Sequence, residues 1–341
     1  MGDEHLGAAL RRGTRLIVCT LMAAFFGALK VAAAGEPLPR DLGTWTHTVE
    51  NDWFGGQDRN YTNGTRYAYV TRAVEPMAWE QRLIRDPERS KTFRRGFAFA
   101  QTLHTPDNIR TPTPAEDDHP YAGYMFIEYA LMTEDQGVVD ILTLEAGVVG
   151  PWALGEEIQT WYHGVIAGDD PLGWDAQHPN EVVANLSFDR KGRALFTAKA
   201  GWLGLDLTPS YGVTLGTVNI NARAGGMVRL GNRLGSDFGP ARIRPSLTGS
   251  GHFDYVQPAA WYVFFGAQAR AVAHDLTLNG SLFRDDGPSV ERNTWVGDLQ
   301  YGYAVQLGRI QLAWTSVKRT ERFATQDGPD RFGAISLSVK F

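Results

Sequence analysis

The sequence is almost without cysteine, and its single cysteine, Cys19, falls in a segment that we expect to be removed. Three arginines precede an apolar run over residues 16–29, which closes on small residues at 32–34. This order of charge, apolar run and Ala-x-Ala cleavage site is typical of a secretory signal peptide. We predict a signal peptide over residues 1–34, with an uncleaved anchor as the alternative. The mature chain, residues 35–341, then has neither disulfides nor thiol chemistry.

After residue 34 the sequence also lacks long apolar runs and any block of basic residues. No run approaches the roughly 20 apolar residues that a membrane-spanning helix needs. Of the chain's 33 basic and 38 acidic residues, four basic and two acidic lie in the signal segment, leaving 29 against 36. A mildly acidic chain without a basic patch is not expected to bind nucleic acid.

Several catalytic motifs are missing as well. The sequence has no HExxH motif, no paired cysteines and no other zinc-type spacing. It also has no Gly-x-Ser-x-Gly nucleophile elbow. If the protein is a hydrolase, these absences favour an activated water over a serine acyl-enzyme.

Glycine and aromatic residues are abundant, with Gly 38, Trp 10, Tyr 12 and Phe 17. Secretion, many aromatics and no spanning helix together suggest an outer-membrane barrel. Most of the mature chain alternates apolar and polar residues, which predicts about twelve strands, an even number as single-chain bacterial barrels require. We place these strands at 44–51, 65–71, 93–101, 121–131, 138–149, 195–204, 205–216, 218–230, 260–274, 293–306, 310–320 and 332–341.

The last predicted strand carries the clearest barrel pattern. Gly333, Ile335, Leu337, Val339 and Phe341 alternate with small or polar residues, and the chain ends on an aromatic residue. In a barrel such alternation puts one row towards lipid and the other towards the lumen. We therefore predict an all-β fold, a transmembrane antiparallel β-barrel with short helical segments in its outer loops.

The strand count also predicts which connections share one end of the barrel. With both termini on the periplasmic side, the connections 52–64, 105–120 and 151–181 all lie at the outer end. We also expect a short amphipathic helix over residues 76–88. The irregular segment 231–257 fits less well, because it would be a long connection on the side where short turns are usual.

The alternation of apolar and polar residues that predicts strands is interrupted within residues 147–168. A Gly-Pro pair ends a strand, and Ile158, Trp161 and Tyr162 then follow at helical spacing. Gln159 and His163 are four residues apart, so a helix places both on one face. A neutral imidazole can act as a general base, and a neighbouring amide can orient it or donate to an oxyanion. The alternative is a helix that only covers the barrel mouth, with His163 as a polar cap.

A second polar cluster lies at the first hairpin. Asn51 and Asp52 end the first strand, and Thr62 lies near the start of the next. Such oxygen-bearing side chains could form a hard-cation site, although alternation sends Asn51 and Asp52 to opposite faces unless a bulge intervenes. The alternative is ordinary turn chemistry.

Four short motifs follow one another along the chain. They are Glu50-Asn51-Asp52, Asp58-Arg59-Asn60-Tyr61-Thr62-Asn63-Gly64, Pro120-Tyr121-Ala122-Gly123, and Val149-Gly150-Pro151 continuing through Gln159 to His163. In this order they resemble the LpxR-type lipid A 3′-O-deacylases. The resemblance covers most of the mature chain and is densest in its first half.

This resemblance implies a twelve-stranded barrel in the bacterial outer membrane whose site faces the outer leaflet. It implies a calcium-dependent esterase that removes the 3′-linked acyloxyacyl group of lipid A, the lipid anchor of lipopolysaccharide. His163 matches the base that activates water, and Gln159 matches a glutamine one turn earlier. Asn51 and Asp52 match an Asn-Asp pair beside the calcium ion, and Thr62 matches a site hydroxyl.

The sequence departs from the family pattern at three places. Characterised members have a lysine in the second outer loop, where this chain offers Arg110 as a phosphate contact. An acidic residue is expected after the histidine, and either Asp169 or Asp170 could supply it; we assign Asp169 as a further metal ligand. Pro171 stands where a tyrosine is expected.

The competing hypothesis is a non-catalytic barrel, either a small pore or a surface-binding scaffold.

Overall fold

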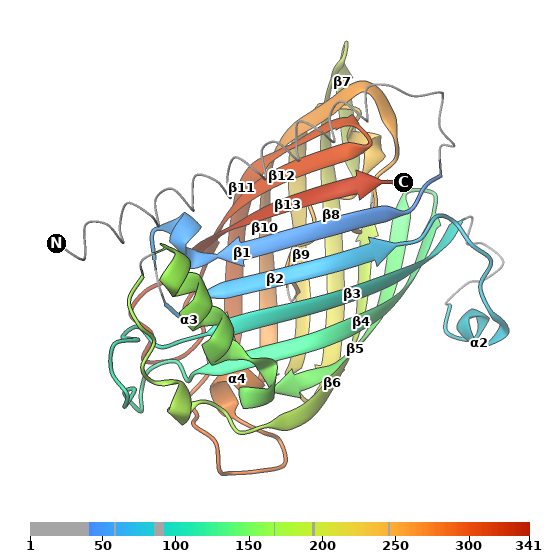
Figure 1. Ribbon diagram of the computed structural model, residues 1–341. Helices are drawn as coiled ribbons and strands as arrows, with labels where there is room; N and C mark the ends of the chain where they lie inside the picture. The colour runs from blue at the N-terminus through green and yellow to red at the C-terminus, as the bar shows by residue number, and fades with distance from the viewer. Residues whose placement is uncertain (1–40, 58, 85–91, 167, 193–194, 245) are drawn as a thin grey trace.

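The protein forms one closed antiparallel β-barrel (Figure 1). The structure, a computed structural model, describes residues 41–57, 59–84, 92–166, 168–192, 195–244 and 246–341. The predicted signal peptide lies outside these residues. The twelve strands of the wall are β1 (Thr44–Asn51), β2 (Asn63–Val70), β3 (Thr92–His104), β4 (Ala122–Asp135), β5 (Val138–Val149), β6 (Glu181–Gly192), β8 (Leu203–Gly216), β9 (Asn219–Asn232), β10 (Val256–Asp275), β11 (Trp295–Gly308), β12 (Ile310–Arg319) and β13 (Asp330–Lys340).

Two pairings complete the closed wall, one between its first and last strands and one across the β7 hairpin. β1 pairs with β13 over its whole length, from Thr44 opposite Lys340 to Asn51 opposite Gly333. β6 pairs with β8, bypassing the intervening strand. The other wall pairings join consecutive wall strands. The predicted fold class is therefore confirmed.

Alternation along each strand separates the lumen from the outer surface. On β1, Thr44, Thr46 and Thr48 are buried, whereas Trp45 between them is exposed. The same alternation puts polar side chains inside and apolar side chains outside, as expected for a wall that faces lipid. Among the described residues, no helix is both long enough and apolar enough to cross a membrane.

One predicted strand was wrong and one wall strand was missed. The segment assigned to 195–204 contains only the short strand β7 (Phe196–Ala200), which forms a hairpin with the start of β8. The sixth wall strand is instead β6, which begins where the predicted loop ends, in a stretch to which no strand was assigned. One error added a strand and the other removed one. The total of twelve is therefore still correct, and so is the end of the barrel to which each of the three outer connections was assigned.

The three predicted outer connections do lie together at one end of the barrel (Figure 1). They hold the short helices η1 (Asp52–Gly55), η2 (Pro151–Ala153), α3 (Gly155–Ile166) and η3 (Trp174–Ala176), and α4 (Leu276–Asn279) follows β10 at the same end. The helix expected over 76–88 is only the four-residue α2 (Ala78–Gln81), and residues 85–91 lie outside the described part of the chain.

The long connection after β9 is not an exposed loop. Residues 233–244 and 246–255, which we call the luminal segment, include the short helix η4 (Leu234–Ser236) near their start and are mostly buried. The guanidinium of Arg242 donates to both carboxylate oxygens of Glu50 on β1, at 3.0 and 3.2 Å. The luminal segment is therefore longer than a periplasmic turn because it folds back and fills the interior of the barrel.

A buried ion-pair network anchors the start of the luminal segment. Arg229 on β9 donates to both oxygens of Asp206 on β8, at 2.9 and 2.6 Å, and to Asp237 at 2.6 Å. Removing one partner of a buried pair leaves uncompensated charge and typically costs about 3–5 kcal/mol. Arg229→Met should therefore lower the free energy of unfolding by about this amount, measured by urea unfolding in lipid vesicles.

The matched control for this prediction is Arg284→Met. Arg284 pairs with Glu181 at 3.3 Å, and its side chain is 37% exposed. Partly exposed pairs contribute about 1 kcal/mol or less. Equal losses in the two variants would contradict a special role for the Arg229 network.

Candidate active site

The outer end of the first hairpin buries the predicted oxygen cluster. Asn51 is the N-cap of η1, and its side-chain oxygen accepts from the backbone N–H of Trp53 at 2.8 Å. The Asp52 carboxylate accepts from the backbone N–H of Arg59 at 2.6 Å. The 3-10 turn redirects the chain as the strand ends, so Asn51 and Asp52 are both buried without the bulge that the sequence suggested.

Thr62 lies beside this turn. Its backbone carbonyl accepts from the Asp52 N–H at 3.4 Å, and its hydroxyl is 2.7 Å from the hydroxyl of Thr105 in the second outer loop. The structure therefore brings Asn51, Asp52 and Thr62 together, and it adds Thr105, which the sequence did not single out.

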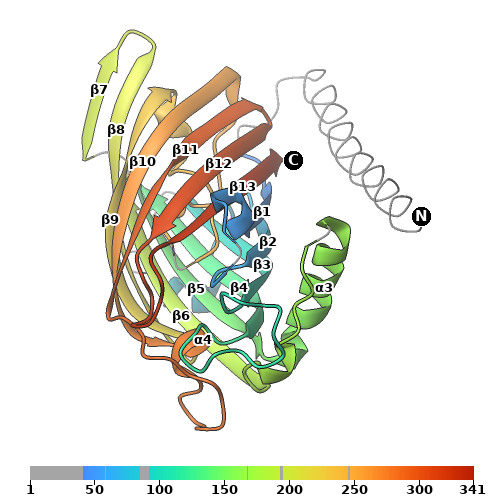
Figure 2. The same cartoon turned by 90° about the vertical axis from the view of Figure 1, so that its left-hand side faces the viewer.

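Helix α3 is held against the outer surface of the wall by close packing at its N-terminal end. The side chain of Gln101 on β3 donates to the carbonyl of Ala153, just before the helix, at 2.6 Å. Gly155 lies so close to Trp174 that a Cβ there would be 2.5 Å from the indole ring. Leu103, on the same strand face as Gln101, is buried together with Trp174. The helix therefore covers the outer ends of neighbouring strands rather than entering the lumen (Figure 2).

Gln159 and His163 lie on the face of α3 that is turned towards the protein, and both are buried. The side-chain oxygen of Gln159 accepts from the indole N–H of Trp174 at 2.7 Å. Its buried amide nitrogen has no hydrogen-bond partner among the described residues. An unsatisfied buried donor is costly, so this amide is a ready donor for a substrate oxygen.

His163 is held in one tautomer. Its Nδ1 lies 2.5 Å from the backbone oxygen of Asp169. Because a carbonyl only accepts, Nδ1 carries the hydrogen and Nε2 of the neutral ring is left as an acceptor. This is the form that a general base needs.

The segment after α3 is tied to the second outer loop. The Asp169 carboxylate forms an ion pair with Arg110, and both side chains are substantially exposed. Arg110 and Asp169, predicted separately as a substrate contact and a metal ligand, are thus direct neighbours. Because the backbone carbonyl of Asp169 also accepts from His163, Asp169 contacts both the second outer loop and the imidazole ring.

The charge of the hairpin cluster acts on the helix. Burial, followed by the negative charge of Asp52, raises the pKa of Tyr162 above its usual value. Tyr162 precedes His163, so the C-terminal half of α3 is within the electrostatic influence of Asp52. Sequence reasoning assigned no role to Tyr162 or Trp174, although both sit within or just after the helical segment that it singled out.

The donors near Asp52 suit a hard cation better than a transition metal. Within the described ranges, no three His, Cys, Asp or Glu side chains gather as a metal site. The cluster instead offers one buried carboxylate with amide, hydroxyl and backbone oxygens. Calcium accepts such mixed oxygen ligands, whereas zinc prefers histidine and cysteine.

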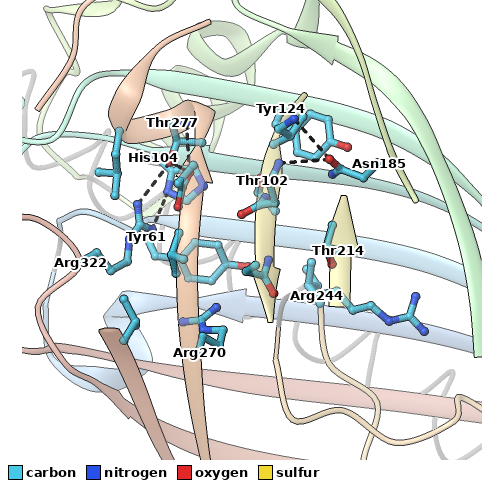
Figure 3. Close-up of a pocket in the computed structure, with 18 of the residues that line it drawn as sticks. Tyr61, Thr102, His104, Tyr124, Asn185, Thr214, Arg244, Arg270, Thr277 and Arg322 are labelled. Atoms are coloured by element: carbon cyan, nitrogen blue, oxygen red, sulfur yellow. Dashed lines mark hydrogen bonds between the residues drawn. The ribbon is translucent and has the colours of Figure 1, made fainter. Parts of the chain in front are cut away.

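A separate polar cavity of about 80 Å³ lies inside the lumen (Figure 3). Arg322 lines this cavity and donates to the hydroxyl of Thr277 at 3.3 Å, and His104, Tyr61 and Arg270 face the same space. None of the predicted catalytic residues lines it. The chemistry predicted from the sequence therefore lies at the outer rim and not in this cavity.

The closed barrel, its lipid-facing apolar surface and a buried polar site at one rim define the class: an integral membrane β-barrel of the outer-membrane type. A family model described as "Outer membrane protein LpxR" matches residues 16–341, so the chain belongs to the LpxR family and is an integral outer-membrane protein. No curated protein sequence matches the chain.

One of the solved structures shares this fold. LpxR from Salmonella typhimurium is similar with a TM-score of 0.73 and 18% identity, covering 87% of this chain and 100% of that one. The β domain of the Bordetella autotransporter BrkA has a TM-score of 0.42 and 9% identity, over 89% of this chain and 100% of that one.

Proposed function

We propose that this protein is a lipid A 3′-O-deacylase, an esterase that hydrolyses the 3′-linked acyloxyacyl ester with a water activated by His163 and with a bound calcium ion. The observation that carries this proposal is the state of His163. It is buried on the same face of α3 as Gln159, its Nδ1–H is held by the Asp169 carbonyl, and its neighbour Tyr162 interacts with Asp52. Membership of the LpxR family supports the same conclusion.

The proposed chemistry begins at Nε2 of His163. This nitrogen removes a proton from water as the water oxygen attacks the ester carbonyl carbon, forming a tetrahedral oxyanion. The free amide of Gln159 is placed to donate to that oxyanion or to the attacking water. When the intermediate collapses, the sugar oxygen leaves and takes the proton from His163. The products are a free 3′-hydroxyl group and an acyloxyacyl acid.

Asn51 and Asp52 are the residues that would hold the calcium ion, and Asp169 remains a predicted further ligand. When bound, the ion supplies positive charge that polarises the ester carbonyl. The hydroxyl of Thr62, paired with Thr105, lies beside the backbone of Asp52 and is available to the same site.

Arg110 is proposed to contact a phosphate of the lipid. In the structure it pairs with Asp169, so phosphate binding would exchange one anionic partner for another. An exposed pair of this kind is worth at most about 1 kcal/mol, which makes the exchange inexpensive. A phosphate at Arg110 would also release the Asp169 carboxylate for the metal.

The competing pore has less support. The luminal segment and the Arg242–Glu50 pair occupy the interior of the barrel, whereas a water-filled porin needs an open lumen. A binding scaffold without catalysis would explain the buried polar residues at the rim. It would not require a histidine held in the tautomer of a base.

The test is hydrolysis by the purified, full-length barrel in detergent micelles that contain lipid A. With calcium, mass spectrometry should detect loss of an acyloxyacyl chain and appearance of the corresponding acid. A chelator should abolish this release, and added calcium should restore it. Steady conductance in planar bilayers without any hydrolysis would instead support the pore.

A further inference from the structure

We propose that α3 is a membrane-anchoring element whose outward apolar stripe inserts into the hydrocarbon of the outer leaflet. The stripe consists of Leu154, immediately before α3, with Ile158 and Trp161. These residues follow one another at positions i, i+4 and i+7, so they share one side of the helix. Their exposed fractions are 46%, 39% and 66%.

The helix has three distinct sides. Gln159 and His163 form the buried side, and Glu156, Glu157 and Thr160 form an exposed polar side. The apolar stripe lies between them. A helix in water would not keep a tryptophan, an isoleucine and a leucine in line on its exposed surface, whereas a helix at a membrane interface does.

The stripe is continuous with the lipid-facing belt of the wall. Strand register places Phe99 on β3 opposite Tyr67 on β2 and opposite Ile127 on β4. All three point outward and are at least 44% exposed. Gln101 and Leu103, the next two residues on that face of β3, are buried.

The apolar belt therefore ends where the helix begins, with no intervening polar surface on β3. Trp152 before α3 and Trp53 on η1 are also highly exposed at this end. Exposed tryptophans at the rim are typical of the aromatic girdle at a membrane–water interface. The occupant that fits this surface is lipid hydrocarbon.

The placement has a consequence for the proposed esterase, and this step rests on the proposed function. With the apolar stripe in lipid, the buried side of α3 opens towards the wall at the depth of the leaflet. An acyl chain could then approach His163 while it remains in hydrocarbon. Trp161, one residue before Tyr162, would act as a positioning residue and not as a catalytic one.

The insertion can be tested without measuring activity. The variants Ile158→Cys, Thr160→Cys and Trp161→Cys of the mature chain, which has no other cysteine, are each labelled with an environment-sensitive fluorophore in phosphatidylcholine vesicles. Labels at 158 and 161 should emit at shorter wavelengths and be quenched by spin-labelled lipid, severalfold more than the label at 160. Thr160 is the control because it is exposed on the same helix. Water-like emission at 161, equal to that at 160, would overturn the proposal.

A kinetic comparison tests the consequence separately. Trp161→Ser should raise KM severalfold for lipid A in vesicles and leave kcat unchanged, and hydrolysis in detergent micelles should also be unchanged. An equal loss in vesicles and micelles would contradict a role in membrane positioning. If the wild-type protein shows no hydrolysis at all, the esterase proposal fails, while the labelling result still decides whether α3 is inserted.

Discussion

Replacing His163 with alanine is expected to reduce lipid A deacylation by roughly 10²–10⁴-fold, the usual contribution of a general base. The physical reason is that Nε2 of this ring is the acceptor that we propose takes a proton from water. The other ring nitrogen already donates to the Asp169 carbonyl. The measurement is the rate of acid release from lipid A by the purified variant at saturating calcium.

The control for this variant is Thr160→Ala, because Thr160 lies one turn before Gly164 on the exposed side of the same helix. It should retain wild-type activity. Both variants should keep the heat-modifiable gel mobility of a folded barrel, since neither residue belongs to the wall. A folded His163→Ala protein with full activity would disprove the assignment of His163 as the base.

Asp52→Asn is expected to cause the second large loss. The substitution keeps the shape and leaves an oxygen that can accept from the Arg59 N–H, but it removes the negative charge that would attract calcium. Loss of supporting groups around a metal typically costs 10–100-fold in affinity or activity, and loss of a direct ligand should cost at least about that much. Activity measured against calcium concentration should show half-maximal activation shifted upward by this factor.

Asp117→Asn is the matched control, because Asp117 is an exposed carboxylate of the second outer loop. Its calcium dependence should be unchanged. If both variants activate at the same calcium concentration as the wild-type protein, Asp52 is not a ligand. Loss of activity in Asp52→Asn without any change in the calcium response would point to a structural role in the η1 turn.

The sequence predicted the wall strands best where the two faces differ strongly in polarity. β1 and β13 alternate threonine, serine and glutamate with aromatic and aliphatic residues, so their register and sidedness can be read directly. β6 also alternates, but its luminal residues include Asp189 and Lys191. Such charges are typical of loops in a single sequence. Only charges on other strands that also point into the lumen explain them, for example Arg223 on β9, which pairs with Asp189.

The candidate site was predicted in parts. Helical spacing was enough to put Gln159 and His163 on one face, and antiparallel order was enough to put their connection at the same end as Asn51 and Asp52. Neither could reveal that the hydrogen bond from Trp174 would hold Gln159 or that the Asp169 carbonyl would select the tautomer of His163. These contacts depend on how the loop after α3 folds, for which the sequence has no periodic signal.

The sequence by itself therefore determined the barrel class, the number of wall strands and the grouping of three connections at the outer end. These properties follow from residue alternation, which is local in the sequence, and from the number of strands, because successive antiparallel strands end at opposite ends of the barrel. Tertiary structure decided that the luminal segment fills the barrel and that α3 lies on the outer surface of the wall with an apolar stripe exposed. Both outcomes depend on which distant charges and surfaces meet, such as Arg242 with Glu50, and that information appears only when the barrel closes.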